Sequence, residues 1–376
     1  MVLKTPRKIA VFSALILVLG LPQGRHVWAQ SPYVYSDSDL LALASAHSAS
    51  ERHHLPLGDG HYALDAPRKG YIYLCHLPRS DEGGAKGQGP WISGSTWSPD
   101  EKTFVSGAKS WGEAVFSMDR AQGQRVFSGN GLPINHTTGT FPIQSSDNAF
   151  RYDRNPNRIS QQALSESVSL TPHYTDPPYC MGMEVGVMLT GVPLFNGFDA
   201  GLRDAAAHEI QDSCSGHPQQ NGKYHYHSLS ACIKYADIHT VLGYALDGFP
   251  ITGGEIAAGK NLMTSDLDVC HGLVSEIKLD GVNTISYHYV MTPDFPYSVS
   301  CFRAPGGRID PAGGEKMRLG NRDSPPSGRR PPPEAVNACD GSVTGGSCGF
   351  ISPRGDRVEG ACSPIGGSSL ACVPGR

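Results

Sequence analysis

Charged residues are scarce in this chain of 376 residues, since Asp, Glu, Lys and Arg together make up 18% of it, against about 25% in a typical globular protein. The 31 basic and 35 acidic side chains leave a net charge of −4. A protein that binds nucleic acid through its phosphates needs a basic surface, which this balance does not supply. The sequence therefore predicts no nucleic-acid partner.

Several catalytic and nucleotide-binding signatures are also missing. His208-Glu209 is not followed by a second histidine at the spacing of a zinc protease. The sequence has no Gly-x-Ser-x-Gly elbow and no glycine-rich phosphate-binding loop. We therefore expect no nucleotide cofactor, and the sequence alone does not decide whether the protein is an enzyme.

Long apolar runs are absent after the N-terminus. The first residues contain Lys4, Arg7 and Lys8, followed by an apolar run over 9–21 and a more polar stretch ending at Ala29. This order is typical of a cleavable signal peptide, and the run is too short to span a bilayer, which takes about 20 residues. We expect export to the periplasm or the outside, with no membrane span after cleavage.

Glycine and proline are abundant, with 45 and 29 residues. Short apolar runs such as 103–105, 114–116 and 125–127 alternate with turn residues. This composition and spacing predict a mainly β protein, an antiparallel sandwich-like domain with one short helix. The best helix candidate in the body is 199–211, with Asp199 as its cap.

Changes in composition along the chain predict its domain organisation. A Pro-, Gly- and Arg-rich stretch follows the body and reads as a linker. The expected parts are a signal peptide over 1–29, an N-terminal segment over 30–87, a main domain over 88–303, a linker over 304–335 and a cysteine-containing tail over 336–376.

Two segments in the middle of the chain resemble each other. Residues 186–197 and 243–254 agree in type at their glycines, at a proline and at aliphatic positions. The run Asp-x-Cys-x-Gly then occurs at 212–216 and at 268–272, and Tyr-His-Tyr occurs at 224–226 and at 287–289. Matches in the same order indicate an internal duplication, with units at about 184–240 and 241–303.

The two copies differ in their histidines and share their other features. His217 and His227 of the first copy correspond to Leu273 and Val290 of the second.

Asp247-Gly248 between two apolar runs predicts a tight hairpin turn, and the proline at position 250 would then lie on an edge strand.

The ten cysteines of an exported chain are expected to form disulfides. Six lie in the body and four in the tail, and sequence alone leaves several pairings open. One disulfide in each copy is the preferred arrangement, Cys214 with Cys232 and Cys270 with Cys301, which leaves Cys75 for Cys180.

The sequence resembles the YHYH-domain family of secreted proteins over about 88–303. The matching stretches are Gly89-Pro90-Trp91-Ile92, Asn130-Gly131-Leu132-Pro133, Thr138-Gly139-Thr140-Phe141-Pro142, Tyr152-Asp153-Arg154-Asn155-Pro156-Asn157, Gly182 to Cys232, Gly243 to Gly254, and Thr292-Pro293-Asp294-Phe295-Pro296-Tyr297. The resemblance implies secretion and domain boundaries and does not imply an activity.

The histidines of the first copy are the best candidates for a functional site. In a strand, alternate side chains point to opposite faces, so His225 and His227 would lie on one face, close enough to bind one metal ion. A third ligand is expected from His217 or His288, and His208 and His136 are further candidates. Imidazole ligands suit several transition metals, of which copper or zinc is expected here.

Acidic and phenolic side chains near these histidines could orient them or act in catalysis. Glu209, Asp212 and Asp268 could bind the metal, orient an imidazole through its other N–H, or do neither. Tyr224 and Tyr226 are further candidates for hydrogen bonds to the ligands. A zinc site would activate water for hydrolysis, with Glu209 or Asp212 as the base, and a copper site would carry out redox chemistry.

Two functions remain open from the sequence. The first is a secreted metal-binding protein or metalloenzyme with an unknown substrate. The alternative is a non-catalytic secreted or surface-associated binding module, in which Tyr-His alternation packs a β core and the histidines are structural. Acid–base catalysis by the histidines without a metal is a third reading.

Overall fold

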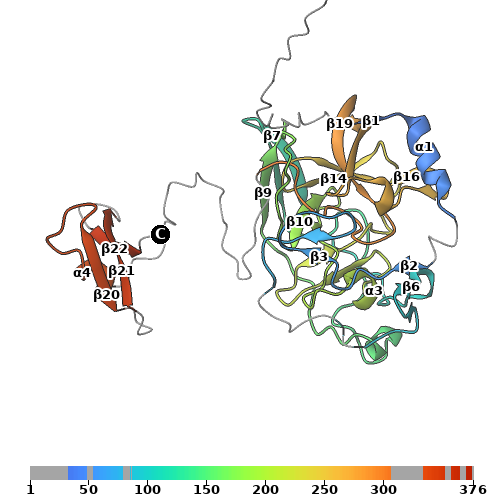
Figure 1. Ribbon diagram of the computed structural model, residues 1–376. Coiled ribbons are helices and arrows are strands. Elements are labelled where there is room, and N and C mark those ends of the chain that lie inside the picture. Colours follow the sequence, from blue (N-terminus) through green and yellow to red (C-terminus); the bar gives the residue numbers. More distant parts are fainter. Residues whose placement is uncertain are drawn as a thin grey trace, which may run out of the picture. The chain divides into compact units, whose positions relative to one another are not determined.

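The structure is a computed structural model that describes residues 33–48, 54–78, 85, 87–305, 333–351, 357–364 and 370–374. The chain divides into two compact units, Met1–Arg318 and Leu319–Arg376, coloured along the sequence in Figure 1. The expected signal peptide and most of the expected linker lie outside the described residues. Within the described part of the chain, no helix has the length and apolar composition of a membrane span.

The first unit is built around a nine-stranded sheet. Its strands are β1 (Val34–Tyr35), β10 (Glu184–Met188), β11 (Pro193–Phe195), β12 (Gly216–Pro218), β13 (Tyr224–Tyr226), β14 (Val241–Ala245), β15 (Pro250–Gly253), β18 (Gly272–Leu279) and β19 (Val282–Met291). They lie in the order β1-β18-β19-β15-β14-β10-β11-β13-β12. The expected mainly β fold is confirmed, although the sheet is mixed, because β1–β18, β11–β13 and β15–β19 pair parallel.

The strand order is the same on both sides of the central pair β10–β14. From this pair outward, β10-β11-β13-β12 corresponds to β14-β15-β19-β18. The sense of pairing also agrees: antiparallel, parallel and antiparallel in each half. This agreement supports the hypothesis of an internal duplication.

Equivalent turns precede β12 and β18. Asp212 accepts hydrogen bonds from the backbone N–H groups of Cys214 and Gly216. Asp268 accepts the equivalent bonds from Cys270 and Gly272. A Cβ atom on Gly216 would lie 2.2 Å from the ring of Tyr224. The motif therefore needs glycine at this position, because the tyrosine ring lies across the backbone.

Smaller sheets surround the large one. They consist of β2 (Leu55–Pro56), β5 (Ile92–Ser93) and β6 (Thr96–Trp97); β3 (Tyr62–Ala63) and β4 (Ile72–Tyr73); β7 (Phe116–Ala121), β8 (Gln124–Gly129) and β9 (Leu164–Ser169); and β16 (Glu255–Ala257) and β17 (Lys260–Asn261). Phe127 of β8 packs against Tyr244 of β14, with ring centroids 5.9 Å apart. The β7–β8–β9 sheet thus forms a second layer over the centre of the nine-stranded sheet.

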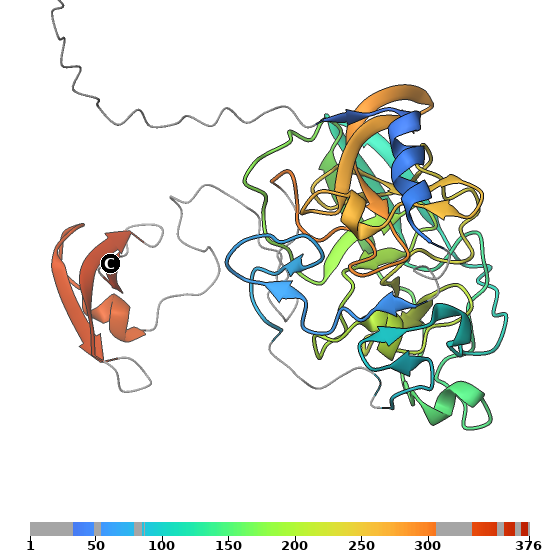
Figure 2. The ribbon, with the colours of Figure 1, turned by 45° about the vertical axis from the view of Figure 1, so that its right-hand side comes forward.

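The helices of the first unit are α1 (Asp37–Ala46) and α3 (Ala205–His208), with 3-10 turns at η1 (Pro99–Glu101), η2 (Asn148–Arg151) and η3 (Thr264–Asp266). Helix α1 lies beside β18 and β19 (Figure 2). Its N-cap is Ser36, whose side chain accepts a hydrogen bond from the N–H of Asp39.

The expected helix over 199–211 is mostly wrong, because only Ala205–His208 is helical and Asp204 is its N-cap. The side chain of Asp199 instead accepts from the backbone N–H groups of Gly201 and Arg203, a local arrangement that competes with helix formation.

Two of the three short apolar runs are also not the expected strands. Within 103–105 only Val105 forms an isolated bridge, and of 114–116 only Phe116 belongs to a strand, β7. Residues 125–127 lie in β8 as expected.

The expected hairpin at Asp247-Gly248 is confirmed, since β14 and β15 pair antiparallel across it. The edge position expected for Pro250 is wrong, because β15 lies between β14 and β19. Pro250 is instead the first residue of β15, a place where a strand tolerates a residue without an N–H.

The disulfides of the first unit are Cys75–Cys180, Cys214–Cys232 and Cys270–Cys301, the arrangement that the sequence favoured. The second unit consists of α4 (Pro333–Asn337) and a sheet of β20 (Ser347–Ile351), β21 (Arg357–Pro364) and β22 (Leu370–Pro374). It contains Cys339–Cys362 and Cys348–Cys372, whose half-cystines form much of its small core.

Candidate metal centre

The hairpin of β12 and β13, at one end of the nine-stranded sheet, carries most of the predicted site. The two strands pair antiparallel with His217 opposite His225, and His227 follows β13 directly. Because side chains alternate along a strand, His225 points away from the face of Tyr224 and Tyr226. Each of the three histidines is 3% exposed, so the hairpin buries all three imidazoles.

The ring nitrogens of these histidines converge. One nitrogen from each ring lies within 4.8 Å of the other two, and the Nε2 atoms of His225 and His227 are 3.0 Å apart. Nδ1 of His227 lies 2.6 Å from the carbonyl oxygen of Asn196, and Nδ1 of His225 lies 3.1 Å from that of Lys223. Since a carbonyl only accepts, both Nδ1 atoms carry the proton, and the neutral rings direct their Nε2 lone pairs toward each other.

Two lone pairs that face each other repel unless a cation lies between them. A proton is a poor choice at neutral pH, because burial lowers the pKa of His227 to about 4 and lowers those of His217 and His225 well below the usual value. Neither ring nitrogen of His217 has a hydrogen-bond partner, which is unusual for a buried polar group. The three rings form a group that could hold a metal ion.

Glu209, the residue after α3, adds a carboxylate oxygen to this group. Its Oε2 atom lies 3.3 Å from Nε2 of His217 and 3.4 Å from Nε2 of His227, and it accepts no hydrogen bond. Burial, and then repulsion from Asp199 and Asp153, raises the pKa of Glu209 well above its usual value. Since the histidines are neutral, these contacts are not ion pairs, and this carboxylate oxygen is buried without a hydrogen-bond partner.

Two of the separations between these atoms have the length expected in a tetrahedral metal centre. Zinc binds histidine nitrogen at ~2.0–2.1 Å and carboxylate oxygen at ~2.0–2.2 Å, so neighbouring ligand atoms lie ~3.3–3.4 Å apart. The Glu209–His217 and Glu209–His227 separations have this length, and the His225–His227 separation of 3.0 Å is slightly shorter. The ring of His217, which no hydrogen bond holds, can turn to close the set.

Lys102 fixes the backbone at Glu209. Its Nζ atom donates to the carbonyl oxygens of Ala206 and Glu209 and to the side-chain oxygen of Gln211. Burial lowers the pKa of Lys102 to about 7. Lys102 also lines a cavity of about 300 Å³, together with Ala206 of α3 and Gln211.

His288, the alternative third ligand, lies in the second half of the sheet. Its Nδ1 and Nε2 atoms are each 2.9 Å from a hydroxyl oxygen, of Thr252 and Ser275 respectively. Leu273 lies opposite His288 in the register that His217 and His225 share. Leu273 and Val290 belong to an apolar cluster that packs against helix α1, so the second half buries carbon where the first half buries ring nitrogens.

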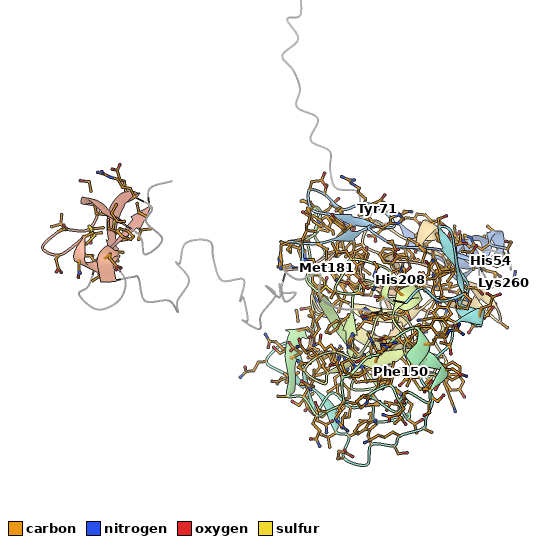
Figure 3. All side chains as sticks on the ribbon, turned by 90° about the horizontal axis from the view of Figure 1, so that it is seen from below. His54, Tyr71, Phe150, Met181, His208 and Lys260 are labelled. Atoms are coloured by element: carbon orange, nitrogen blue, oxygen red, sulfur yellow. A yellow bond between two sulfur atoms is a disulfide. The ribbon has the colours of Figure 1, made fainter. Side chains whose placement is uncertain are left out.

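The two further candidate histidines also lie outside the group. His208, labelled in Figure 3, has its Nε2 atom 2.9 Å from a carboxylate oxygen of Asp59. Nε2 of His136 lies 2.5 Å from the hydroxyl oxygen of Tyr226.

Asp212, Tyr224 and Tyr226 make hydrogen bonds away from His217, His225 and His227. The Tyr224 hydroxyl donates to Asp212 at 2.9 Å, and that carboxylate organises the turn before β12. The Tyr226 hydroxyl lies 3.3 Å from the side-chain oxygen of Thr190. Of the residues expected around the ligands, Glu209 alone touches them in the contacts described here, and it does so as a candidate ligand.

Two other groups of potential ligand atoms contain cysteine. They are His136 with Cys214 and Cys232, and Cys339 with Cys348 and Cys362. All of these cysteines form disulfides, and a thiolate rather than a disulfide is the metal ligand. Among the described residues, the histidine group is the one of these three whose ligand atoms are all available.

Histidine nitrogen and carboxylate oxygen are ligand types that zinc takes in proteins. The model of the family described as YHYH protein matches residues 166–263. This match agrees with part of the resemblance noted from the sequence, and the matched stretch contains all four side chains of the group. No curated protein and no solved structure matches the chain.

Proposed function

We propose that the first unit is an exported metal-binding domain whose ligands are His217, His225, His227 and Glu209. The observation that carries this proposal is the convergence of their Nε2 and Oε2 atoms, with no hydrogen bond to Glu209 Oε2 or to either ring nitrogen of His217. In a metal-free protein these groups cost free energy, because buried polar atoms without partners lose their hydration. A single cation removes that cost at four side chains together.

Zinc is the metal that the ligands suit best. The proposed set contains three imidazole nitrogens and one carboxylate oxygen and no sulfur, and soft thiolate or thioether ligands are the ones that select Cu(I). The Glu209 contacts have the length of a tetrahedron edge, which zinc favours. Cu(II) is the second choice, because it shares the preference for imidazole and prefers a tetragonal arrangement.

The arrangement favours a metal that is enclosed over one that is open to substrate. Four protein ligands fill a tetrahedral zinc site, whereas catalytic sites keep one position for water. The side chain of Glu209 is 11% exposed, against 4% for His217 and 3% for His227, so Glu209 is the ligand closest to solvent. Hydrolysis would require Glu209 to leave the metal, and stabilisation of the hairpin requires no such step.

The pairing of the cysteines indicates an oxidising compartment, which an exported protein reaches. Five disulfides and no free cysteine are found, and disulfides persist in oxidising compartments. We therefore propose that the protein works in the periplasm or outside the cell.

Metal content is the measurement that tests the proposal. We expect about one zinc per chain in tag-free protein and none in the His225→Ala/His227→Ala variant. His288→Ala is the matched control, since it removes an equally buried histidine outside the group and should keep the metal. A folded wild type that holds no metal after incubation with zinc and with copper would leave the histidines as structural residues of a binding module.

Replacing Glu209 by Gln tests the fourth ligand. The amide keeps the shape of the side chain and removes the charged oxygen, so we expect zinc affinity to fall at least tenfold. Stability of the metal-free protein should change little, because the Oε2 atom of Glu209 has no hydrogen bond to lose. Competition with a chromophoric chelator measures the affinity, and an unchanged value would show that Glu209 is not a ligand.

A further inference from the structure

The Cys214–Cys232 disulfide encloses most of the proposed metal site. It joins residues 18 apart, and His217, His225 and His227 all lie between them. Glu209 lies a few residues before Cys214. The disulfide therefore ties the start of β12 to the segment that follows β13.

Within the sheet β12 is held from one side, and hydrogen bonds from Gly216 to Asp212 and from Asn155 to the carbonyl oxygen of Pro218 hold its two ends. It is the last strand of the sheet and has β13 as its neighbour, with three residues paired. Across the base of the hairpin, the Ser230 hydroxyl donates to the carbonyl oxygen of Cys214 at 2.6 Å. A three-residue strand with one neighbour has ladder hydrogen bonds on one side only, so a covalent link at its base contributes to the order of the site.

The two sulfur atoms differ in their surroundings. Cys214 is 2% exposed, whereas Cys232 is half-buried. A ring nitrogen of His136 lies within 4.8 Å of both sulfur atoms. An external thiolate can therefore approach Cys232, while Cys214 is the buried leaving group with an imidazole beside it.

We infer that the Cys214–Cys232 disulfide is a redox switch for the metal site, an inference that rests on the proposed function. In the oxidised protein the ligands are held together and bind metal tightly. In the reduced protein the hairpin opens locally, and the ion must then supply the free energy that orders it again. By linkage, bound metal also makes this disulfide harder to reduce.

The reductant that the switch takes is a dithiol, free or on a protein. One thiolate of the dithiol attacks the sulfur of Cys232, the Cys214–Cys232 bond breaks, and Cys214 leaves as a thiolate that takes up a proton. The second thiol of the reductant then displaces Cys232. Two electrons and two protons pass to the protein, and the dithiol becomes a disulfide.

The Cys214→Ser/Cys232→Ser variant tests the inference without free thiols, which would bind metal themselves. We expect its zinc affinity to fall about 10- to 100-fold, measured by competition with a chelator. The matched control is Cys270→Ser/Cys301→Ser, which removes the equivalent disulfide of the second half, separated by 31 residues and enclosing no proposed ligand. This control should keep its affinity within twofold while losing thermal stability.

Equal zinc affinity in the wild type and in Cys214→Ser/Cys232→Ser would overturn the switch and leave the metal site intact. Absence of zinc binding in the oxidised wild type would instead overturn the proposed function.

A second measurement on the wild type covers the case in which the serine variant does not fold. Thiols formed during reduction with a phosphine are alkylated and located by mass spectrometry, with and without zinc. We expect zinc to slow reduction of Cys214–Cys232 at least tenfold and to leave Cys270–Cys301 unaffected, and equal protection of both would refute the switch.

Discussion

Chelation of the metal is expected to lower the melting temperature of the first unit by about 10 °C. A ligand at a thousand times its Kd stabilises the folded state by about 4 kcal/mol, and ~1 kcal/mol shifts the melting temperature of a domain of roughly this size by ~2–4 °C. Removing the ion also restores the facing lone pairs of His225 and His227 and the unpartnered carboxyl of Glu209. Scanning calorimetry of tag-free protein, with and without excess chelator and without reductant, measures the shift.

The His225→Ala/His227→Ala variant separates a metal site from a structural core. With its ligands removed, the variant should melt at the same temperature with and without chelator. If the histidines only pack the core, the wild type itself will show no response to chelator, while the variant still melts lower because it has lost buried side chains.

The histidines of the site could be predicted from the sequence because they follow local rules. Alternation along a strand puts His225 and the following His227 on one side, and a short connection brings His217 opposite His225. Two of the disulfides join cysteines that are close in sequence and lie in the same half of the large sheet, Cys214 with Cys232 and Cys270 with Cys301. Such features need only a few residues of chain and one type of secondary structure.

The position of Glu209 could not be predicted in this way. Its carboxyl group reaches the histidines because α3 ends one residue before it, and that end is held by Lys102, which is 107 residues away in the chain. The expected longer helix would have pointed this side chain elsewhere. Contacts over such distances leave no periodic pattern in the sequence.

The same limit explains why the sequence offered His288 as an alternative third ligand. The run Tyr-His-Tyr is the same in β13 and in β19. The His288 ring, however, lies between the hydroxyl groups of Thr252 and Ser275. Its neighbours Leu273 and Val290 pack under helix α1, an element that precedes both repeats. The second half of the sheet thus has Leu273 and Val290 packed against α1. The first half has His217 and His227 at the corresponding positions, where their ring nitrogens converge.

The buried histidines of the second half predict a loss of stability in acid. Burial lowers the pKa of His288 to about 3, below the value of about 6.5 expected in the unfolded chain. A histidine with a depressed pKa binds fewer protons when folded, so its contribution is complete above pH ~6.5 and is lost as the pH falls toward 3. At pH 4 the loss for one such group is on the order of 3 kcal/mol.

Substitution of His288 by Gln should therefore flatten the pH dependence of stability. We expect the free energy of unfolding to fall between pH 7 and pH 4 by on the order of 3 kcal/mol less in His288→Gln than in the wild type. The constant cost of the substitution cancels, because each protein is compared with itself at two pH values by urea titration. The control is Ile277→Val, at a buried side chain of the same strand pair that does not titrate, which should keep the wild-type slope. Equal slopes in the wild type and His288→Gln would mean that this ring accepts a proton in the folded protein, in spite of its burial between two hydroxyl groups.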